Sequence, residues 1–473
     1  MAIMPDMPTS FIRALPDPDH VQVMETHISW VLLAGEFAYK LKKPVTLPFL
    51  DYGTVEKRRA CCAAELHLNR RFAPELYLEV VELAGEPAVK MRRFDEALRL
   101  DHVCARGALT TAQLGQLART LVAFQATAAI PPVPQGFPSV TPDFGAPPTI
   151  LADALENFTE LVRLLPAEHD RLGALEKWTR NEFAARQDDF AARRAAGRVR
   201  DGHGDLHLGN LVLLDGRIIP FDCIEFNDSF RCIDVASEIA FTLLDLLDHD
   251  NPGLATWLLD AWLMASGDFS ALVVLRFYLV YRGLVRAKVA ALRGDGAEAT
   301  GYLLLAQRLA VPKLTPTLTI THGPSGCGKT YASSRRLTSA DFLDTVRFRS
   351  DVERKRLFGL APEAASDGSI YTPEATRRTY ARLAALAEDA LQSGWSVIVD
   401  AAFLKCAERN HFHDLAARLG VPFGILAPTA PPTELARRID MRQNDASEAT
   451  VAVLEQQLHW LEPLGSDEPG SSA

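Results

Sequence analysis

The first hundred residues alternate short apolar runs with polar ones at the two-residue period of half-buried strands. The runs "HISWVLLAG" and "EFAYKLKKPV" meet at Gly35 and predict a β-hairpin, because a glycine between two alternating runs marks a turn. The stretch "TVEKRRACCAAELHLNRRFA" then has helical spacing, and "LYLEVVELAG" and "PAVKMRRF" return to the period of strands. Residues 20–100 are therefore predicted to form a small sheet with one inserted helix.

From about Ala108 the pattern becomes mostly helical. A proline-rich stretch at 130–148, "IPPVPQGFPSVTPDFGAPP", is too long and irregular for a helix or strand, and helical spacing resumes from Thr149 to about Ala196. Two short apolar runs in "NLVLLDGRIIPFD" then flank Asp215-Gly216, which is a strong hairpin signal. Helical spacing dominates again from Ile233 to about Leu309.

The last third of the chain alternates strand and helix patterns. It follows the segment "AVPKLTPT", in which Pro312 and Pro316 cannot continue a helix, so a domain boundary is expected there. A βα series of this kind predicts a parallel sheet with helices on both faces. The expected elements are a strand at 317–322, a helix from 329, a strand at 345–349, a helix at 373–392, a strand at 395–400, a helix at 407–419, a strand at 422–427 and two final helices.

Two or three domains are expected for 473 residues, of which 48% are hydrophobic. The predicted fold class is mixed α/β and α+β. An amino-terminal domain, 1–312, has an N-lobe at about 20–100 and a C-lobe at about 101–312, and a parallel α/β domain follows at 313–465. The polar segment "GSDEPGSSA" predicts a disordered tail at 466–473.

Composition and charge exclude several kinds of partner. The net charge of −10 argues against an extended nucleic-acid partner, since such proteins usually carry a basic excess. The seven cysteines form no C-x-x-C pair and fit a reducing compartment. The chain shows neither the pattern of a signal peptide nor an apolar run of about 18 residues. We expect a cytoplasmic protein without a membrane partner, and the oligomeric state stays open.

A first candidate site lies in "HGDLHLGNLVLLDGRIIPFD". Asp205 and Asn210 stand five residues apart on one short loop, and Asp222 follows the hairpin that returns beside Asn210. A phosphotransferase needs a carboxylate for the attacking hydroxyl and two hard oxygen ligands for the magnesium that bridges the nucleotide phosphates. These three side chains are expected to converge on one metal cluster. The alternative is structural, because a lone Asp-Gly pair is a turn and a lone histidine is a packing partner.

The ordered set of His203, Asp205, Asn210, a hairpin and Asp222 resembles the aminoglycoside phosphotransferase and choline kinase group, which are cousins of the protein kinases. The resemblance implies a bilobal protein-kinase-like domain, with Asp205 as catalytic base, Asn210 and Asp222 as magnesium ligands, and His203 as a brace of the loop. In "RCIDVASEIA" it also implies that Asp234 hydrogen-bonds the catalytic loop. The alternative for Asp234 is an N-cap of the following helix.

Such a kinase also needs a lysine for the α- and β-phosphates, paired with a glutamate on the helix of its N-lobe. In "FAYKLKKPV", strand alternation puts Lys40 and Lys42 on one face and Lys43 on the other, which leaves the first two as candidates. The expected helix partner is Glu65, with Glu56 as second choice. No G-x-G-x-x-G precedes this strand, so neither a phosphate-covering loop nor acceptor-binding residues are predicted.

A second candidate site is "GPSGCGKT", which satisfies G-x-x-x-x-G-K-[ST] between an apolar strand and a helix. Its glycines let backbone N–H groups turn toward a β-phosphate, and the helix amino terminus adds its positive dipole end. Lys329 is expected to reach the β- and γ-phosphates, and Thr330 is expected to bind magnesium. The predicted nucleotide contacts are Gly323, Pro324, Ser325, Gly326, Cys327, Gly328, Lys329 and Thr330.

Two carboxylates downstream lie at predicted strand ends, where α/β folds bind their ligands. Asp400 ends the strand in "WSVIVDAAF" and is the candidate Walker-B magnesium ligand, with a turn aspartate as the alternative. Asp351 ends the strand in "VRFRSDVERKRLFG" and is the candidate base for the acceptor hydroxyl. The competing interpretation of that segment is a capping box between Ser350 and Glu353.

Cationic groups are also expected near the transferring phosphoryl. The candidates are Arg409, after the Walker-B strand, and Arg437, Arg438 and Arg442 in "ELARRIDMRQNDASEA". Arg438 and Arg442 share one helix face at i, i+4, which predicts a lid helix that closes over ATP. The alternative is an ordinary charged surface helix.

The motifs "GPSGCGKT", "RSD", "VDAAF" and "RRIDMRQNDASEA", over about 317–465, resemble the small P-loop kinases of the gluconate kinase, polynucleotide kinase and zeta-toxin group. The order of the two parts resembles bacterial fusions of an aminoglycoside phosphotransferase-like domain with a P-loop kinase. The resemblances imply a bifunctional phosphotransferase, each part moving phosphate from Mg-ATP to a hydroxyl of a small-molecule acceptor. Two alternatives stay open: one site is a non-catalytic ATP sensor, or the P-loop part is a toxin-like kinase of a nucleotide sugar.

Cys327 stands inside the phosphate loop. A helix amino terminus and a nearby lysine favour the thiolate form of a cysteine. This predicts that oxidation or alkylation of Cys327 blocks nucleotide binding and that ATP protects it. The alternative is a small residue that fills space.

Overall fold

The computed structural model of the chain describes residues 7–47, 50–131, 143–311, 315–441, 446–465, 468 and 470–471. The chain forms two compact units, Met1–Asp153 with Gln187–Asp245 and Ala154–Arg186 with Leu246–Ala473. The helical part of the chain from residue 246 to residue 310 belongs to the same unit as the parallel sheet that follows residue 312. The boundary expected there lies inside the second unit and stays a prediction from the sequence.

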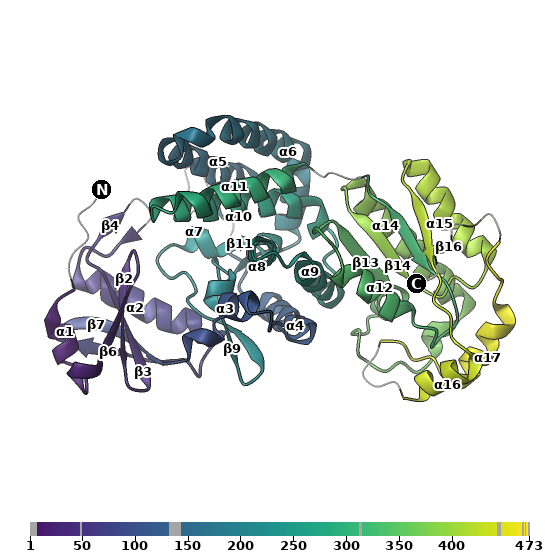
Figure 1. The fold of residues 1–473 in the computed structure, drawn as a ribbon, viewed down its shortest axis with the longest axis horizontal. Helices are drawn as coiled ribbons and strands as arrows, with labels where there is room; N and C mark the ends of the chain where they lie inside the picture. Colours follow the sequence, from purple (N-terminus) through teal and green to yellow (C-terminus); the bar gives the residue numbers. More distant parts are fainter. Residues whose placement is uncertain are drawn as a thin grey trace. The chain divides into compact units, whose positions relative to one another are not determined.

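The first unit contains a five-stranded antiparallel sheet with the order β1-β2-β3-β7-β6 (Figure 1). The predicted hairpin is confirmed, with Gly35 in the left-handed region at φ +57°, where glycine is favoured. The predicted helix is also confirmed as α2 (Val55–Asn69), which packs on β6 and β7. The strands are β1 (Gln22–Glu25), β2 (Ser29–Ala34), β3 (Phe37–Lys42), β6 (Tyr77–Leu83) and β7 (Glu86–Arg92).

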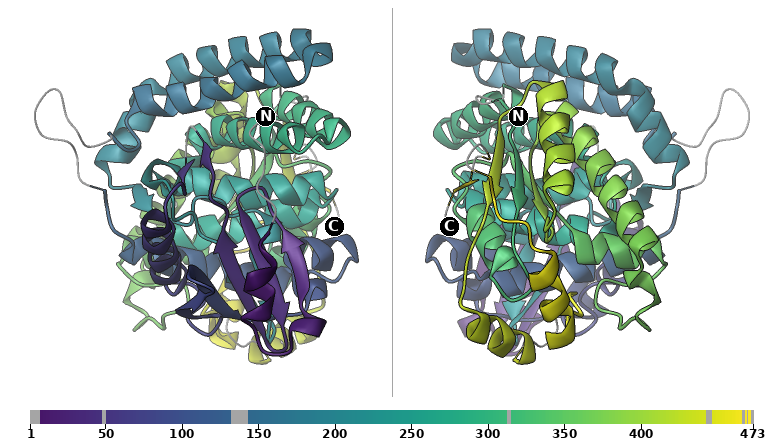
Figure 2. Two further views of the ribbon diagram at one scale, coloured as in Figure 1. Left: turned by 90° about the vertical axis from the view of Figure 1, so that its left-hand side faces the viewer. Right: turned by 90° about the vertical axis from the view of Figure 1, so that its right-hand side faces the viewer.

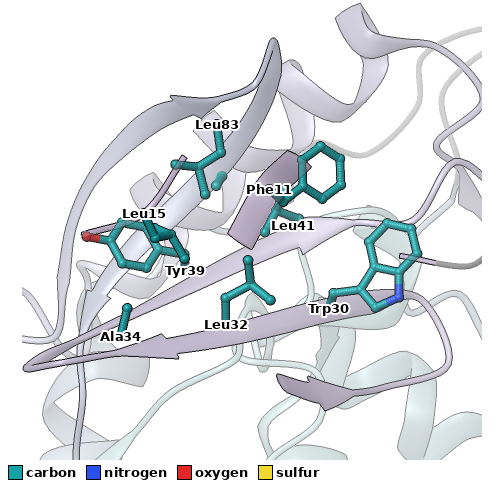
Figure 3. Close-up of a cluster of buried hydrophobic side chains, with 9 residues drawn as sticks. Phe11, Leu15, Trp30, Leu32, Ala34, Tyr39, Leu41 and Leu83 are labelled. Carbon is teal, nitrogen blue, oxygen red and sulfur yellow. The ribbon is translucent and has the colours of Figure 1, made fainter. Parts of the chain in front are cut away.

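The two faces of this sheet differ sharply in polarity. Figure 3 shows Trp30, Leu32 and Ala34 on one side of β2, and a buried cluster forms there with Phe11 and Leu15 from the segment around α1 (Thr9–Arg13). Because strand side chains alternate, the lysines of β3 are left on the opposite face, toward α2. The apolar cluster thus fixes the orientation of the polar face.

The rest of the first unit is helical with short strand pairs. Asp215 and Gly216 have φ +49° and +75°, the left-handed pair of a two-residue hairpin turn, so the predicted hairpin is confirmed. Its elements, with the small pair near the start of the chain, are β4 (Thr46–Leu47), β5 (Leu50–Asp51), α3 (Leu100–Ala105), α4 (Thr111–Thr127), β8 (Val199–Asp201), β9 (Leu211–Leu214), β10 (Arg217–Pro220), α7 (Asp228–Arg231), β11 (Cys232–Asp234) and α8 (Val235–Asp248).

Two long helices, α5 (Pro147–Leu164) and α6 (His169–Ala195), follow the proline-rich segment and run side by side (Figure 2). Residues 132–142 of that segment lie outside the described part of the chain. Helix α5 begins two residues before the predicted Thr149, at Pro147. A proline is tolerated in a first helical turn because its missing N–H has no partner there.

The second unit contains a parallel sheet with the order β13-β14-β12-β15-β16. The predicted βα series is confirmed, and its first strand, β12, lies at the centre of the sheet. The chain runs from β12 to β13 at one edge and later from β14 to β15 on the other side of β12, so the carboxyl end of β12 lies at the switch point where such sheets bind ligands. The strands are β12 (Leu318–Thr321), β13 (Thr345–Arg349), β14 (Ser396–Asp400), β15 (Phe423–Leu426) and β16 (Gly470–Ser471).

The helices of the second unit flank this sheet or precede it in the chain. They are α9 (Pro252–Ser266), α10 (Ala271–Leu292), α11 (Gly296–Ala310), α12 (Lys329–Thr338), α13 (Ser350–Leu357), α14 (Pro373–Gln392), α15 (Cys406–Leu419), α16 (Pro432–Asp440) and α17 (Val451–Trp460). Among the described helices, none combines the length and the apolar character that a membrane crossing needs.

The carboxyl-terminal tail differs from the predicted disorder in its described residues. Gly470 and Ser471 pair in parallel with Ile425 and Leu426 of β15, and Glu468 forms an ion pair with a buried arginine of α15. Main-chain pairing to a sheet edge needs no apolar side chain, so a polar composition does not reveal it.

Candidate functional sites

The polar face of the amino-terminal sheet carries a chain of buried charges. Lys40 Nζ lies 2.8 Å from Glu65 Oε1 and also forms an ion pair with Asp222. Lys42 forms ion pairs with Glu65 and with Glu225. Both lysines therefore lie on the face predicted by strand alternation, and Glu65 of α2 is the partner of each.

Burial and charge act against each other in this cluster. Burial opposes the ionisation of Glu65, but the ammonium groups of Lys40 and Lys42 outweigh it and lower the pKa of Glu65 to about 2. Burial likewise opposes the charge of Lys40, yet the carboxylates of Asp222 and Glu65 raise its pKa well above the ordinary value. Glu65 and Lys40 are thus ionised at neutral pH.

The side chains of Lys40 and Lys42 differ in their exposure to solvent. The side chain of Lys42 is fully buried, and that of Lys40 keeps 11% exposure beside Asp222, which is 40% exposed. Glu56, the second choice as partner, lies exposed in the first turn of α2. Lys43 points to the other face and pairs with Glu25 at 2.5 Å. An approaching anion would therefore meet Lys40.

The loop between β8 and β9 holds His203, Asp205 and Asn210 together. The buried His203 ring has its Nε2 2.8 Å from Phe221 O, and Asp205 N lies 3.3 Å from its Nδ1. Because Asp205 N–H can only donate, the ring proton is placed on Nε2. Asn210 Nδ2 donates to Asp205 O at 2.9 Å and to Asp205 Oδ2 at 3.2 Å.

Helix α8 anchors this loop through polar side chains that the sequence did not single out. These side chains lie at i, i+4 and i+7 on one face of the helix, and this spacing was the feature of the sequence that could have identified them. They are Glu238, which accepts from His203 N, Thr242, whose Oγ1 donates to Leu206 O at 2.6 Å, and Asp245, which accepts from Leu208 N at 3.0 Å.

The resemblance implied a hydrogen bond between Asp234 and the catalytic loop. In the structure Glu238 makes that hydrogen bond, by accepting from His203 N. The carboxylate of Asp234 forms a buried bidentate ion pair with Arg193, with distances of 2.7 and 2.8 Å. It also accepts from Ala236 N at 2.8 Å, at the start of α8. The N-cap alternative therefore describes Asp234 better.

Asp222 occupies a strained conformation that turns its carboxylate toward Lys40. Its φ is +62°, in the left-handed region that residues other than glycine rarely adopt. Its backbone N–H donates to Tyr77 Oη at 3.0 Å, and the preceding Phe221 N donates to Asn210 O at 3.0 Å. The hairpin thus brings the Asp222 segment beside the Asn210 segment, as predicted from the Asp215-Gly216 turn.

A cavity of about 830 Å³ opens at the edge of the same sheet, lined by parts of β1, β2 and β3 and by residues 92–96. Met24 lies opposite Val31, and Val31 lies opposite Lys40, so these residues share a sheet face. Leu33 lies opposite Ala38 and belongs to that face too. The lining also includes Val23 and Phe37, which lie opposite Leu32 and Ala34 and belong to the other face, so the cavity borders the edge of the sheet and reaches both faces.

The buried His203 predicts a pH dependence of folding. Burial lowers the pKa of its ring below the ordinary 6.5, although Glu238 and Phe221 O favour protonation. Below pH 6.5 the unfolded chain binds the proton more readily, so the free energy of unfolding falls as the pH is lowered toward the folded pKa. His203→Gln should reduce this slope by up to about 1.4 kcal/mol per pH unit.

Denaturant unfolding between pH 7.5 and 5 checks this prediction. The parent and the variant are compared at each pH, because the difference cancels the titration of groups that both share. Equal slopes in the two proteins would show that His203 keeps its ordinary affinity for protons.

In the second unit, the turn after β12 has the backbone of a phosphate-binding loop. Gly323, Gly326 and Gly328 have φ values of +130°, +83° and +103°, which favour glycine. A Cβ at Gly326 would lie 2.6 Å from Leu435 O, so helix α16 approaches the loop too closely for a side chain there. Lys329 Nζ donates to Gly323 O and to Pro324 O, both at 2.8 Å.

The two candidate magnesium ligands of this site lie on adjacent elements. Thr330 is in the first turn of α12, and Asp400 is the buried last residue of β14. Ser333, one turn after Thr330, has its Oγ 3.2 Å from Asp400 Oδ2. Arg349 Nε lies 3.8 Å from the same oxygen. Asp400 therefore faces the helix that carries the loop.

Asp351 lies in the first turn of α13, at the carboxyl end of β13. The competing interpretation, a capping box between Ser350 and Glu353, is wrong, because α13 begins at Ser350 and its N-cap position is Arg349, without a side-chain cap. Glu353 instead forms ion pairs with arginines of α13 and α14. Burial, followed by the charges of Asp351 and Glu448, raises the pKa of Tyr371, so this hydroxyl stays protonated near Asp351.

The arginine candidates separate clearly. Arg409 is buried and forms a bidentate ion pair with Glu468 at 2.6 and 2.9 Å, so it holds the tail rather than a phosphate. Arg437 and Arg438 are exposed and both pair with Glu434, but only the guanidinium of Arg438 also donates to Gly326 O, at 3.3 Å. Arg442 lies outside the described residues.

The outer side of the phosphate loop is covered by α16 and α17. Cys327 is buried in an apolar cluster with Leu435, Ile439 and Leu454, which favours the space-filling alternative for this cysteine. Ser325 N donates to Gln457 Oε1 at 2.7 Å. Gln457 was missed from the sequence, because a glutamine more than 130 residues away carries no motif that links it to the loop.

Comparisons with known proteins give one family model and several relatives. The family model described as an AAA domain matches residues 318–464, which is less than half of the chain. Uncharacterized proteins of Mycobacterium tuberculosis and Mycobacterium bovis are 29% identical over 455 residues, covering 92% of this chain and 89% of each relative.

Similar solved structures fall into two groups. A choline/ethanolamine kinase family protein from Mesorhizobium loti is 14% identical, covers 64% of this chain and 94% of its own, and has a TM-score of 0.41. Aminoglycoside 2′-phosphotransferase-IIIa in its GDP complex is 12% identical, with coverages of 64% and 96% and a TM-score of 0.38. A gluconokinase from Sinorhizobium meliloti is 17% identical, with coverages of 34% and 83% and a TM-score of 0.24.

The sheet topologies and motif positions described above confirm the predicted fold class. An antiparallel sheet with its lysine strand, glutamate helix and following H-G-D loop is the protein-kinase-like arrangement. A parallel sheet with a G-x-x-x-x-G-K-T turn after its central strand is the P-loop arrangement. The chain thus carries the protein-kinase-like arrangement in its amino-terminal part and the P-loop arrangement in its carboxyl-terminal part.

Proposed function

We propose that this chain is a bifunctional phosphotransferase, in which each part transfers the γ-phosphate of Mg-ATP to a hydroxyl of a small-molecule acceptor. The observation that carries the proposal is the contact chain Glu65–Lys40–Asp222, which ends beside the loop that holds Asp205. A cation and carboxylates held this close at a partly open site suit phosphate and its metal better than they suit folding stability.

In the first site, the oxygen donors fit magnesium. The amide nitrogen of Asn210 is engaged by Asp205, which leaves its Oδ1 as an acceptor, and the backbone next to Asp222 pairs with Asn210 through Phe221 N and Asn210 O. These are the hard oxygen ligands that Mg²⁺ takes, and the ion would neutralise charge on the nucleotide phosphates. Lys40 would bind phosphate oxygens, and Asp205, which Asn210 orients, would accept the proton of the acceptor hydroxyl.

The cavity lined by Met24 and Leu33 is the place proposed for the nucleotide base. Its lining combines apolar side chains with the polar segment 92–96, a mixture typical of small-molecule sites. Because part of its lining, Met24 and Leu33, belongs to the sheet face of Lys40, a nucleotide could place its base in the cavity and extend its phosphates toward the lysine.

Substitution of the two lysines should give opposite phenotypes. Lys40→Met is expected to lower kcat/KM of the first site by about 10² or more, because it removes charge that binds phosphate, and to cost less stability than Lys42→Met, since Lys40 is partly exposed and Glu65 keeps Lys42. Lys42→Met is expected to cost about 3–5 kcal/mol in the free energy of unfolding, because the buried Glu225 loses its lysine and the buried Glu65 keeps only Lys40.

Denaturant unfolding and acceptor-dependent ADP release, measured on both variants, check this assignment. Lys90→Met is the matched control, since Lys90 lies on the neighbouring strand and pairs with the exposed Glu79. If Lys40→Met unfolds easily and Lys42→Met keeps full stability but loses turnover, the roles of the two lysines are reversed.

In the second site, the amides of the Gly323–Thr330 turn and the ammonium of Lys329 would bind the β- and γ-phosphates. Thr330 and Asp400 supply the hydroxyl and carboxylate oxygens that suit magnesium at such a loop. We assign Asp351 as the base for the acceptor hydroxyl and Arg438, whose guanidinium donates to Gly326 O, as the cation that α16 brings to the loop.

An acceptor screen over sugars, amino alcohols and nucleotides, with ADP formation as the readout, tests the proposal. The parent should turn over acceptors of two kinds, one lost in Asp205→Ala and the other in Lys329→Ala. A variant that leaves every turnover in place would show that its part is a nucleotide sensor. Turnover of nucleotide sugars alone by the P-loop part would instead favour the toxin-like alternative.

A further inference from the structure

Helix α9 precedes the predicted boundary at residue 312, yet it packs directly on the phosphate-loop elements within the second unit. A Cβ at Gly253 would lie 2.0 Å from Thr338 O, so the amino-terminal turn of α9 contacts the carboxyl-terminal end of α12 without room for a side chain. Helix α9 also contacts strand β13.

A buried ion pair crosses this contact. Asp260 of α9 accepts from Arg347 of β13, with Oδ1 3.3 Å from Nε and Oδ2 2.7 Å from the terminal nitrogen NH2. Both side chains are only 4% exposed. The ring of Trp257, one turn earlier on α9, lies 5.9 Å from the guanidinium carbon. The pair is thus shielded from solvent.

The remaining nitrogen of Arg347 reaches the phosphate-loop helix. NH1 lies 3.0 Å from Ser333 Oγ and 2.8 Å from Ser334 Oγ, and 3.5 Å from Thr330 O. Ser333 Oγ in turn lies 3.2 Å from Asp400 Oδ2. Asp260, Arg347, Ser333 and Asp400 therefore form one continuous polar chain.

We propose that Asp260 is a positioning residue of the P-loop site, which holds the buried Arg347 so that Asp400 stays available to the metal. This inference rests on the proposed function of the second site. A bidentate carboxylate engages Nε and NH2 of the guanidinium and leaves NH1 for α12.

Without the Asp260 charge, the buried guanidinium lacks its carboxylate, and a buried unpaired cation is strongly disfavoured. The carboxylate at the other end of the chain is Asp400, one serine away from Arg347. Arg347 then competes with Mg²⁺ for Asp400. The loss of Asp260 should therefore weaken the binding of ATP in the presence of Mg²⁺ and change the binding of ATP without metal only slightly.

The test measures ATP binding to the full-length protein by calorimetry, with Mg²⁺ and with EDTA. The binding that is lost in Lys329→Ala is assigned to the second site, and only this component is compared between variants. In Asp260→Asn, this component should weaken at least 10-fold with Mg²⁺ and stay within 2-fold with EDTA. Ser333→Ala, a smaller change, should show the same selective loss and covers the case in which Asp260→Asn does not fold.

The control is Trp395→Phe, which removes the hydrogen bond from Trp395 Nε1 to Leu272 O, 2.9 Å long, between the helices and the sheet away from the loop. It should bind Mg-ATP as the parent does. Equal weakening by the control, or equal weakening of Asp260→Asn with and without Mg²⁺, would reduce Asp260 to a general packing role. Unchanged Mg-ATP binding in Asp260→Asn would overturn the inference. A parent without any component that depends on Lys329 would instead refute the proposed function.

Discussion

Asp205→Asn is expected to lower acceptor-dependent turnover at the first site by about 10²–10⁴-fold, the usual contribution of a general base, with ATP affinity nearly unchanged. The substitution keeps the size of the side chain and the contact with Asn210, and removes only the ability to take a proton. The Asp205 carboxylate is 36% exposed, so it is accessible to an acceptor. Steady-state ADP release and ATP binding, measured on the same preparation, check both halves of the expectation.

Asp215→Asn provides the matched control for this variant. Asp215 lies at φ +49° in the hairpin turn, a conformation that asparagine tolerates, and the chemical change is identical. It should leave turnover intact. If Asp205→Asn turns over as the parent does, Asp205 is not the base, and if it loses ATP binding as well, its role is structural.

Lys329→Met is expected to weaken ATP binding at the second site by about 10–150-fold, because one hydrogen bond from a charged group to phosphate contributes about 1.5–3 kcal/mol. The ammonium now bonds to Gly323 O and Pro324 O, so it already lies inside the loop and needs only a short movement to reach a phosphate. Turnover of the second acceptor should fall together with binding.

Arg336→Met is the control for this second prediction. Arg336 is an exposed cation of the same helix, seven residues after Lys329, and its removal changes the net charge equally. It should bind ATP as the parent does. Comparable losses in the two variants would mean that long-range charge, and not contact within the loop, governs nucleotide affinity.

Local patterns in the sequence were enough to predict most of the strands and helices and the backbone of both sites, but neither α13 nor β16, whose segment was expected to be disordered. The Asp215-Gly216 turn places Asp222 near Asn210 because a two-residue hairpin allows only one return path. The Gly323–Thr330 turn is likewise determined by its own residues, since three of them need φ values that favour glycine. Such features depend on neighbours within about 20 residues.

Partners distant in the chain could not be predicted. Strand alternation places Lys40 and Lys42 on one face but gives no depth, so the burial of Lys42 under Glu225 was hidden. Arg409 follows the Walker-B strand, yet its partner Glu468 is 59 residues away in a segment that looks disordered. The Asp260–Arg347 pair spans 87 residues across an expected domain boundary.

The number of ATP molecules bound per chain in the presence of Mg²⁺ tests the central claim most directly. Calorimetry should give two sites in the parent, one in Lys329→Met, one in Asp222→Asn and none measurable when both changes are combined. A parent that binds one nucleotide per chain, or a combined variant that still binds two, would contradict the account of two separate Mg-ATP sites.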